Sequence, residues 1–87
     1  MTEILNKLGF KESKGLYYLE NLNEYLSVCR CIAVISTDHK GDDCIGLMFE
    51  WSQNGKLRTI EITKEFYSVD AISKAIEDFK NYQKEYL

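Results

Sequence analysis

Residues 45–62 read IGLMFEWSQNGKLRTIEI, which is two alternating runs of apolar and polar residues on either side of Asn54-Gly55. An Asn-Gly pair is typical of a two-residue type I′ turn, because both central residues of that turn need a positive φ. The stretch therefore predicts a β-hairpin. The turn also fixes its register, which places Phe49 opposite Ile60 and Trp51 opposite Arg58.

This register divides the hairpin into two faces, since successive side chains of a strand point to opposite sides. The apolar face consists of Leu47, Phe49, Trp51, Ile60 and Ile62. The second face is more polar, and it pairs Glu50 with Thr59 and Met48 with Glu61. We expect the apolar face to meet the core, because burial of each large apolar side chain contributes roughly 1.5–3 kcal/mol.

The C-terminal segment predicts a long amphipathic helix. Its apolar residues recur at intervals of three and four, with polar residues between them. They are Val69, Ile72, Ile76, Phe79, Tyr82 and Tyr86. Ser68 is the expected N-cap, and Asp70 complements the positive end of the helix dipole.

The first half of the chain predicts a short helix followed by two strands. Thr2 is the expected cap of a helix that directs Ile4, Leu5 and Leu8 to the core, and Gly9 ends it. Residues 11–14 form a polar connector, residues 16–19 a strand, residues 25–36 a longer strand, and residues 37–42 a loop. The predicted class is α+β in the order α-β-β-β-β-α: a four-stranded antiparallel meander with the long C-terminal helix on one face. Residues 1–87 are expected to form one compact domain.

The strand over residues 25–36 has two phases, and the heavier one is expected to face the core. That phase contains Leu26, Val28, Ile32 and Val34. The opposite side then gathers small or weakly polar residues: Cys29, Cys31, Ala33, Ile35, Cys44, Gly46 and Met48. Such a face is too apolar to be left exposed to water, so we expect another surface to cover it. Arg30 conflicts with this choice, because a guanidinium in the core phase needs a carboxylate partner; otherwise the phase itself is wrong.

Composition limits the classes of function. The net charge of −3 has the wrong sign for a generic binder of phosphate backbones, and the 45% hydrophobic content is that of a folded chain. The N-terminus lacks a secretory signal and the sequence lacks a long apolar run, so a cytoplasmic protein is expected. Three cysteines, two of them one residue apart on a strand, suit buried thiols in a reducing compartment.

Two groups of residues have the side chains of a chemical site but also suit ordinary structural roles. Cys29, Cys31, His39 and Cys44 are zinc-compatible ligand types, but Cys29 and Cys44 would lie about 20 Å apart along neighbouring strands. Cys44 as nucleophile with His39 as base is a hydrolytic alternative, although Asp and Gly are what such a loop needs. The sequence contains no fingerprint of a familiar enzyme or cofactor site, so neither catalysis, cofactor nor metal is expected.

Nucleic-acid binding is an alternative that the sequence leaves open. Its candidate stacking residues are Tyr17, Tyr18, Tyr25, Phe66 and Tyr67, and its candidate phosphate contacts are Lys56, Arg58 and Lys64. Glu61 and Glu65 interrupt that basic stripe. Nucleic acid is therefore a less favoured partner than protein.

The favoured hypothesis is a small non-enzymatic protein-binding module that docks on a larger protein or forms a homodimer, with pairing of edge strands as another route. Its candidate interface residues are Cys29, Cys31, Ala33, Ile35, Cys44 and Met48, together with the carboxylates of Asp42, Asp43, Glu50 and Glu61. In size, mild acidity and lack of catalytic motifs the chain resembles the small inhibitors that phages and mobile elements encode, including anti-CRISPR proteins. The resemblance implies an inhibitor of a nucleic-acid enzyme whose basic groove meets those carboxylates.

Overall fold

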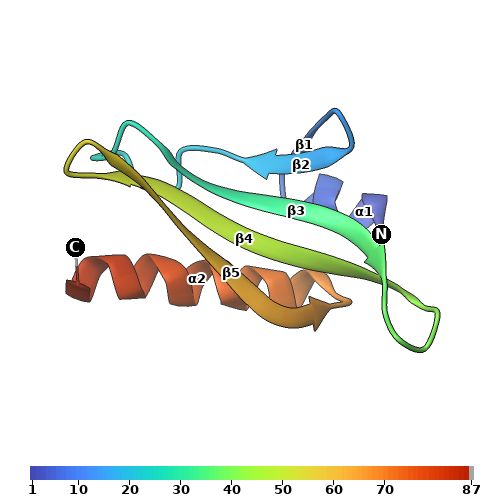
Figure 1. The fold of residues 1–87 in the computed structure, drawn as a ribbon. Coiled ribbons are helices and arrows are strands. Elements are labelled where there is room, and N and C mark those ends of the chain that lie inside the picture. The colour runs from blue at the N-terminus through green and yellow to red at the C-terminus, as the bar shows by residue number, and fades with distance from the viewer. Residues whose placement is uncertain (87) are drawn as a thin grey trace.

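A computed structural model describes residues 1–86. The elements are α1 (Thr2–Lys7), β1 (Lys11–Ser13), β2 (Leu16–Leu19), β3 (Cys29–Thr37), β4 (Asp43–Gln53), β5 (Lys56–Phe66) and α2 (Val69–Tyr86). The strands form one antiparallel meander in the order β1-β2-β3-β4-β5. Both helices contribute to a core on one face of this sheet, and α2 runs along that face (Figure 1). The α+β class and the antiparallel meander are confirmed.

The predicted hairpin is confirmed in its register. Phe49 pairs with Ile60 and Trp51 with Arg58 across β4 and β5. Asn54 and Gly55 both adopt positive φ, 52° and 77°, as a type I′ turn requires. Beyond Leu47 and Ile62 the pairing is irregular, because β5 carries extra residues before Phe66 pairs with Ile45.

The sheet has five strands, so the prediction of four is wrong by one. Residues 11–13, expected to be a connector, form β1 against β2. All three of their side chains are exposed, and a strand with no buried face shows no apolar alternation in the sequence. The available signal was Lys14-Gly15, where both residues adopt positive φ, 53° and 85°.

The predicted phase of the third strand is wrong. Cys29, Cys31 and Ala33 point into the core opposite Trp51, Phe49 and Leu47. Their small volumes leave space for the large side chains of β4 and α2, since interiors are packed to a constant density. The heavier residues of the strand, Ile32 and Val34, lie on the other face. The strand also begins later than predicted, at Cys29.

The centre of the core is an aromatic stack between the sheet and α2. The rings of Phe49 and Phe79 lie 4.2 Å apart at 13°, and Trp51 meets Phe79 at 5.4 Å. Aromatic pairs of this kind stabilise a fold by more than the burial of their apolar area alone. Both contacts join α2 to β4.

The predicted start of α2 is confirmed, because the Ser68 hydroxyl accepts a hydrogen bond from the Ala71 N–H at 3.2 Å. Ile72, Ile76 and Phe79 are buried as predicted. Tyr82 is 48% exposed, and Gln83 takes the next core position instead. The expected burial of the Tyr86 side chain lies outside what the structure describes.

At the other terminus, α1 buries Leu5, with Ile4 and Leu8 packed against the same core. Thr2 is not its cap: the N-cap is Met1, which makes no side-chain capping bond. Gly9 follows the helix with φ of 93°, which confirms the predicted stop.

Candidate protein-binding site

An apolar groove of about 500 Å³ lies between β5 and α2. We call it the β5–α2 groove. Its strand wall is formed by Ile60, Ile62, Lys64 and Phe66, and its helix wall by Ala71, Lys74, Ala75, Asp78 and Tyr82, with Phe49 and Phe79 at its floor. The lining is predominantly hydrophobic with a few charged groups, which is the usual character of a binding site.

The groove exists because α2 presents two adjacent stripes to the sheet. The stripe with Ile72, Ile76 and Phe79 packs against the core. The neighbouring stripe carries Ala71 and Ala75, whose small side chains leave the middle of β5 uncovered. Ile60 was expected to be buried, but its side chain is 46% exposed.

The polar groups at the groove are mostly basic. Lys64 lies on the α2-facing side of β5, with its ammonium 5.3 Å from the centroid of the Phe66 ring. Lys74 lies across from it on α2 and forms an exposed ion pair of 3.5 Å with Asp78. Arg58 pairs with Trp51 and so lies on the same side of β5, two residues before Ile60. The strand side of the groove is therefore positive on a chain whose net charge is −3.

The outer edge of β5 is a free sheet edge in the described chain. β5 is the last strand in the sheet order and is eleven residues long. Figure 1 shows β5 at one side of the sheet with α2 beneath it. An edge strand of this length presents a row of unpaired backbone N–H and C=O groups that another strand can pair with.

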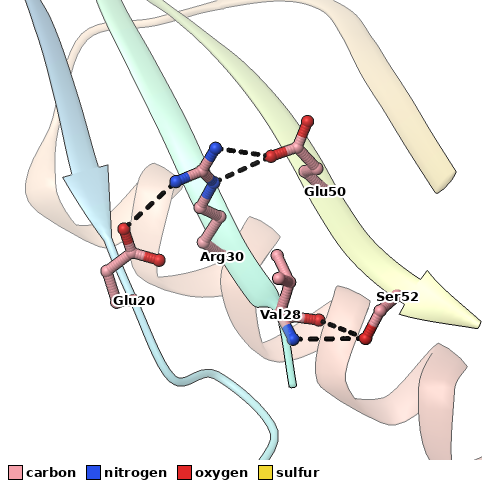
Figure 2. Close-up of polar contacts among 5 residues, drawn as sticks. All are labelled: Glu20, Val28, Arg30, Glu50 and Ser52. Carbon is pink, nitrogen blue, oxygen red and sulfur yellow. Dashed lines mark hydrogen bonds and ion pairs between the residues drawn. The ribbon is translucent and has the colours of Figure 1, made fainter. Parts of the chain in front are cut away.

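The face of the sheet opposite α2, here called the open face, contains an ion-pair network. Arg30 and Glu50 are directly opposite each other on β3 and β4. Arg30 donates from Nε to Glu50 at 2.8 Å, and its Nη2 lies 2.7 Å from the same carboxylate. Glu20 accepts from Nη1 at 3.3 Å (Figure 2). The guanidinium also lies 5.0 Å above the ring of Tyr18. This network explains the sequence conflict at Arg30.

Next to the network the open face is apolar but only partly covered. Leu16 is 36% and Val34 40% exposed, while Ile32 and Met48 pair with each other and are half-buried. Met48, a predicted interface residue, lies here opposite Glu61. None of these four apolar residues lines the β5–α2 groove.

Four of the predicted interface residues are buried in the folded chain and cannot contact a partner: Cys29, Cys31, Ala33 and Cys44. Cys29, Cys31 and Ala33 are each 2% exposed or less. Burial raises the pKa of the Cys31 thiol to about 12 and also raises the pKa of Cys29. Ile35 is half-buried on the same side and packs against the core. These thiols are therefore poor nucleophiles and poor metal ligands.

The loop of residues 38–42 shows the structural role that its composition predicted. The Asp38 carboxylate accepts from the Lys40 and Asp42 N–H groups, each at 2.9 Å, and also from the Tyr67 hydroxyl at 2.5 Å. The Tyr67 bond is the chief cause that lowers the pKa of Asp38. Cys44 is 3% exposed, so it is not an accessible nucleophile for His39 to activate. Within residues 1–86, no three His, Cys, Asp or Glu side chains are grouped to hold a metal.

The candidate nucleic-acid residues are not gathered on one surface. Phe66 is 2% exposed, and Tyr17 packs against the core. Tyr18 lies under Arg30, and Tyr67 donates to Asp38. Tyr25 is 87% exposed but lies in the loop before β3. Lys56, Arg58 and Lys64 share the α2-facing side of β5, but the rings beside them, Trp51 opposite Arg58 and Phe66 next to Lys64, are buried.

The β5–α2 groove was not predicted as a site. The signals were Ala71 and Ala75 beside a core stripe, and the even residues of β5, which read Arg-Ile-Ile-Lys from 58 to 64. The chain matches no family model, no curated protein and no solved structure. In the part of the chain that the structure describes, no helix has the length and apolarity needed to span a bilayer.

Proposed function

We propose that this chain is a small non-enzymatic protein-binding module and that its binding site is the β5–α2 groove. The observation that carries the proposal is an apolar groove that opens beside an eleven-residue edge strand. The groove offers apolar contact, and the edge offers backbone hydrogen bonds. The two together suit another polypeptide better than a small metabolite.

The apolar side chains at the groove support this reading. Ile60 and Tyr82 are 46% and 48% exposed on its two walls. Exposed apolar side chains that adjoin one another, with charged groups at their margin, are typical of protein-interaction sites. Binding of a partner would remove them from water.

An inhibitor of a nucleic-acid enzyme is one form that such a module can take. The carboxylates expected to meet a basic groove differ in their availability. Glu61, Asp42 and Asp43 are exposed. Glu50 is 9% exposed and is held by Arg30, so it is not available to a partner. Of these four carboxylates, Glu61, Asp42 and Asp43 are therefore the ones available to a partner.

The test is affinity capture from the native host with an affinity-tagged chain, followed by mass spectrometry. The wild-type chain is expected to retain a partner in stoichiometric amount, and Ile60→Glu is expected to lose it by placing a carboxylate on the strand wall. Leu57→Glu is the matched control, because Leu57 is 58% exposed on the other side of β5.

A second variant distinguishes the groove from the open face. Met48→Arg alters the open face and can be tolerated there, because the new guanidinium would lie opposite Glu61. We expect it to retain the partner. A partner lost in Met48→Arg but retained in Ile60→Glu would assign binding to the open face, and equal capture by all variants would overturn the proposal.

A further inference from the structure

We infer that the β5–α2 groove receives an extended segment of another protein, which adds to β5 as a sixth strand and carries apolar residues at alternate positions between acidic ones. This inference rests on the proposed function and specifies the chemistry of the partner. It follows from the free edge of β5, the spacing of its groove-side residues and the charge around them.

The edge of β5 favours a strand over a helix as the occupant. A helix satisfies its own backbone and would leave the N–H and C=O groups of the β5 edge to water. An added strand pairs with them and continues the antiparallel meander, and it would lie about 4.8 Å beyond β5. Its side chains on the α2 side would then cover Ile60, Ile62 and Tyr82, which line the groove.

The side chains of β5 specify a pattern for the incoming segment. Arg58, Ile60, Ile62 and Lys64 alternate along the groove side of the strand. In an added strand, the residues opposite them are also spaced by two and directly adjacent. Two apolar residues would face Ile60 and Ile62, and an acidic residue at each end would face Arg58 and Lys64. The recognised motif is therefore acidic-x-apolar-x-apolar-x-acidic.

Charge around the groove supports acidic flanks. Lys74 and Asp78 in the groove lining form an ion pair with each other, so their charges offset, and Arg58 and Lys64 on β5 are the basic groups that remain. Glu61 and Glu65 are on β5 as well, but alternation directs them to the opposite face. A segment with carboxylates at its ends meets complementary charge, whereas a basic segment meets repulsion.

The same charges disfavour a second copy of this chain as the occupant. If two β5 strands paired antiparallel over their full length, the symmetry axis would pass through Glu61. Glu61 would then face the Glu61 of the copy, and Arg58 would face the Lys64 of the copy. Like charges directly opposite each other on neighbouring strands are destabilising. Charged side chains along an edge are also a common device against self-pairing.

The test is fluorescence anisotropy with two labelled peptides. The first is Ser-Asp-Thr-Val-Thr-Val-Thr-Asp-Ser, which has the inferred pattern, and the second replaces both aspartates by lysine. We expect the acidic peptide to bind at least about tenfold more tightly than the basic one, because two cross-strand charge pairs change sign between them. Added salt should reduce this ratio.

Variants of the chain locate the binding. Ala75→Phe fills the groove and is expected to weaken binding of the acidic peptide at least about tenfold. Ser73→Phe is its matched control, because Ser73 is exposed on α2 and does not line the groove. Lys64→Glu should reduce the preference for the acidic peptide, whereas Lys80→Glu, with the same charge change outside the groove, should not. Circular dichroism and the melting temperature confirm that each variant is folded.

Three outcomes would overturn the inference. They are no binding of either peptide up to about 1 mM, equal affinity for the two peptides, and a dimer in light scattering that dissociates in Ile60→Glu. If the captured partner is lost in Ile60→Glu while both peptides fail to bind, the proposed function stands and strand addition fails. If capture also fails to respond to Ile60→Glu, both fail.

Discussion

Glu50 is buried at the middle of β4, and its carboxylate forms an ion pair with Arg30. Arg30 contacts one of its oxygens through two nitrogens, at 2.8 and 2.7 Å. The side chains are 12% and 31% exposed, so the pair is more strongly desolvated than an ordinary surface ion pair. Removal of one partner is therefore costlier than removal of both.

We expect Arg30→Met to lower the free energy of unfolding by about 1–3 kcal/mol, because it leaves a buried carboxylate without its donor. The measurement is urea unfolding at neutral pH. The double variant Arg30→Met/Glu50→Leu should recover much of that loss, and Lys56→Met, at the exposed hairpin end, controls for loss of a cation. A loss in Arg30→Met no greater than in Lys56→Met would contradict the role of the pair.

Asp38 and Tyr67 join the β3–β4 loop to the residues between β5 and α2. Their hydrogen bond is the leading cause that lowers the pKa of Asp38 and raises the pKa of Tyr67 to about 12. Glu65 and Cys44 are the other titratable groups near the Tyr67 hydroxyl. Both shifts favour the bonded pair of ionised Asp38 and neutral Tyr67.

The hydrogen-bonded pair of Asp38 and Tyr67 should stabilise the fold at pH values between the lowered pKa of Asp38 and the raised pKa of Tyr67. Because the pKa of Asp38 is depressed, its contribution is present above the ordinary value of 3.8 and is lost as pH falls through the lowered pKa. Because the pKa of Tyr67 is raised, its contribution is present below pH 10.0 and is lost as pH rises through about 12. Tyr67→Phe should move the pKa of Asp38 upward in a carboxyl ¹³C NMR titration. Tyr25→Phe is the control, and an unchanged Asp38 titration in Tyr67→Phe would refute the bond.

At the scale of elements, α2 contains one polar residue in its core stripe. Gln83 is 3% exposed and accepts a long hydrogen bond, 3.4 Å, from the Cys29 thiol. Its amide nitrogen is buried without a hydrogen-bond partner among the described residues. A buried amide that lacks a partner costs stability, because it loses its hydrogen bonds to water.

We expect Gln83→Leu to raise the free energy of unfolding by about 1 kcal/mol, since leucine has similar helix propensity and brings no orphaned amide. Thermal unfolding followed by circular dichroism measures the change. Asn81→Leu, at an exposed position of the same helix, controls for the added apolar surface. If Gln83→Leu is less stable than the wild-type chain, the buried amide of Gln83 makes a favourable interaction that leucine cannot make, and the prediction is wrong.

The strands show where local patterns suffice and where they do not. The β4–β5 register was predictable because the Asn54-Gly55 turn fixes it locally. The phase of β3 was not predictable in this way. Both of its faces are apolar, and the face with the larger side chains was wrongly expected to be the core face. Arg30 was the available clue, since Glu50 lies directly opposite in the sheet.

For the whole molecule, the number of strands exceeds what the helices can cover. Five strands about 4.8 Å apart span about 19 Å, whereas a helix is about 10 Å wide. The Phe49–Phe79 stack joins α2 to β4, and α1 is only six residues long. Part of the α2-facing surface of β5 therefore stays uncovered. The β5–α2 groove is a consequence of this difference in width between the sheet and the helices.

The proposed function and the proposed strand addition both belong to this scale. The groove combines residues from the middle of β5 with residues of α2 that follow in the chain, and its basic side chains come from both elements. Neither β5 nor α2 alone contains all the residues that form the groove. The sequence hypothesis of protein binding by an apolar surface stays a prediction. The proposed location is now the β5–α2 groove in place of the predicted surface of Cys29, Cys31, Ala33, Ile35, Cys44 and Met48.

Local physical chemistry in the sequence was enough to specify the α+β class, the hairpin with its register, the Ser68 cap and the periodicity of α2. Each of these follows from short-range rules on turn dihedrals, capping and side-chain alternation. Packing between distant segments specified the rest: the inward direction of Cys29 and Cys31, the exposure of Ile60 and Tyr82, and the groove itself. These depend on which volumes fit together across the core, and no local pattern encodes that fit.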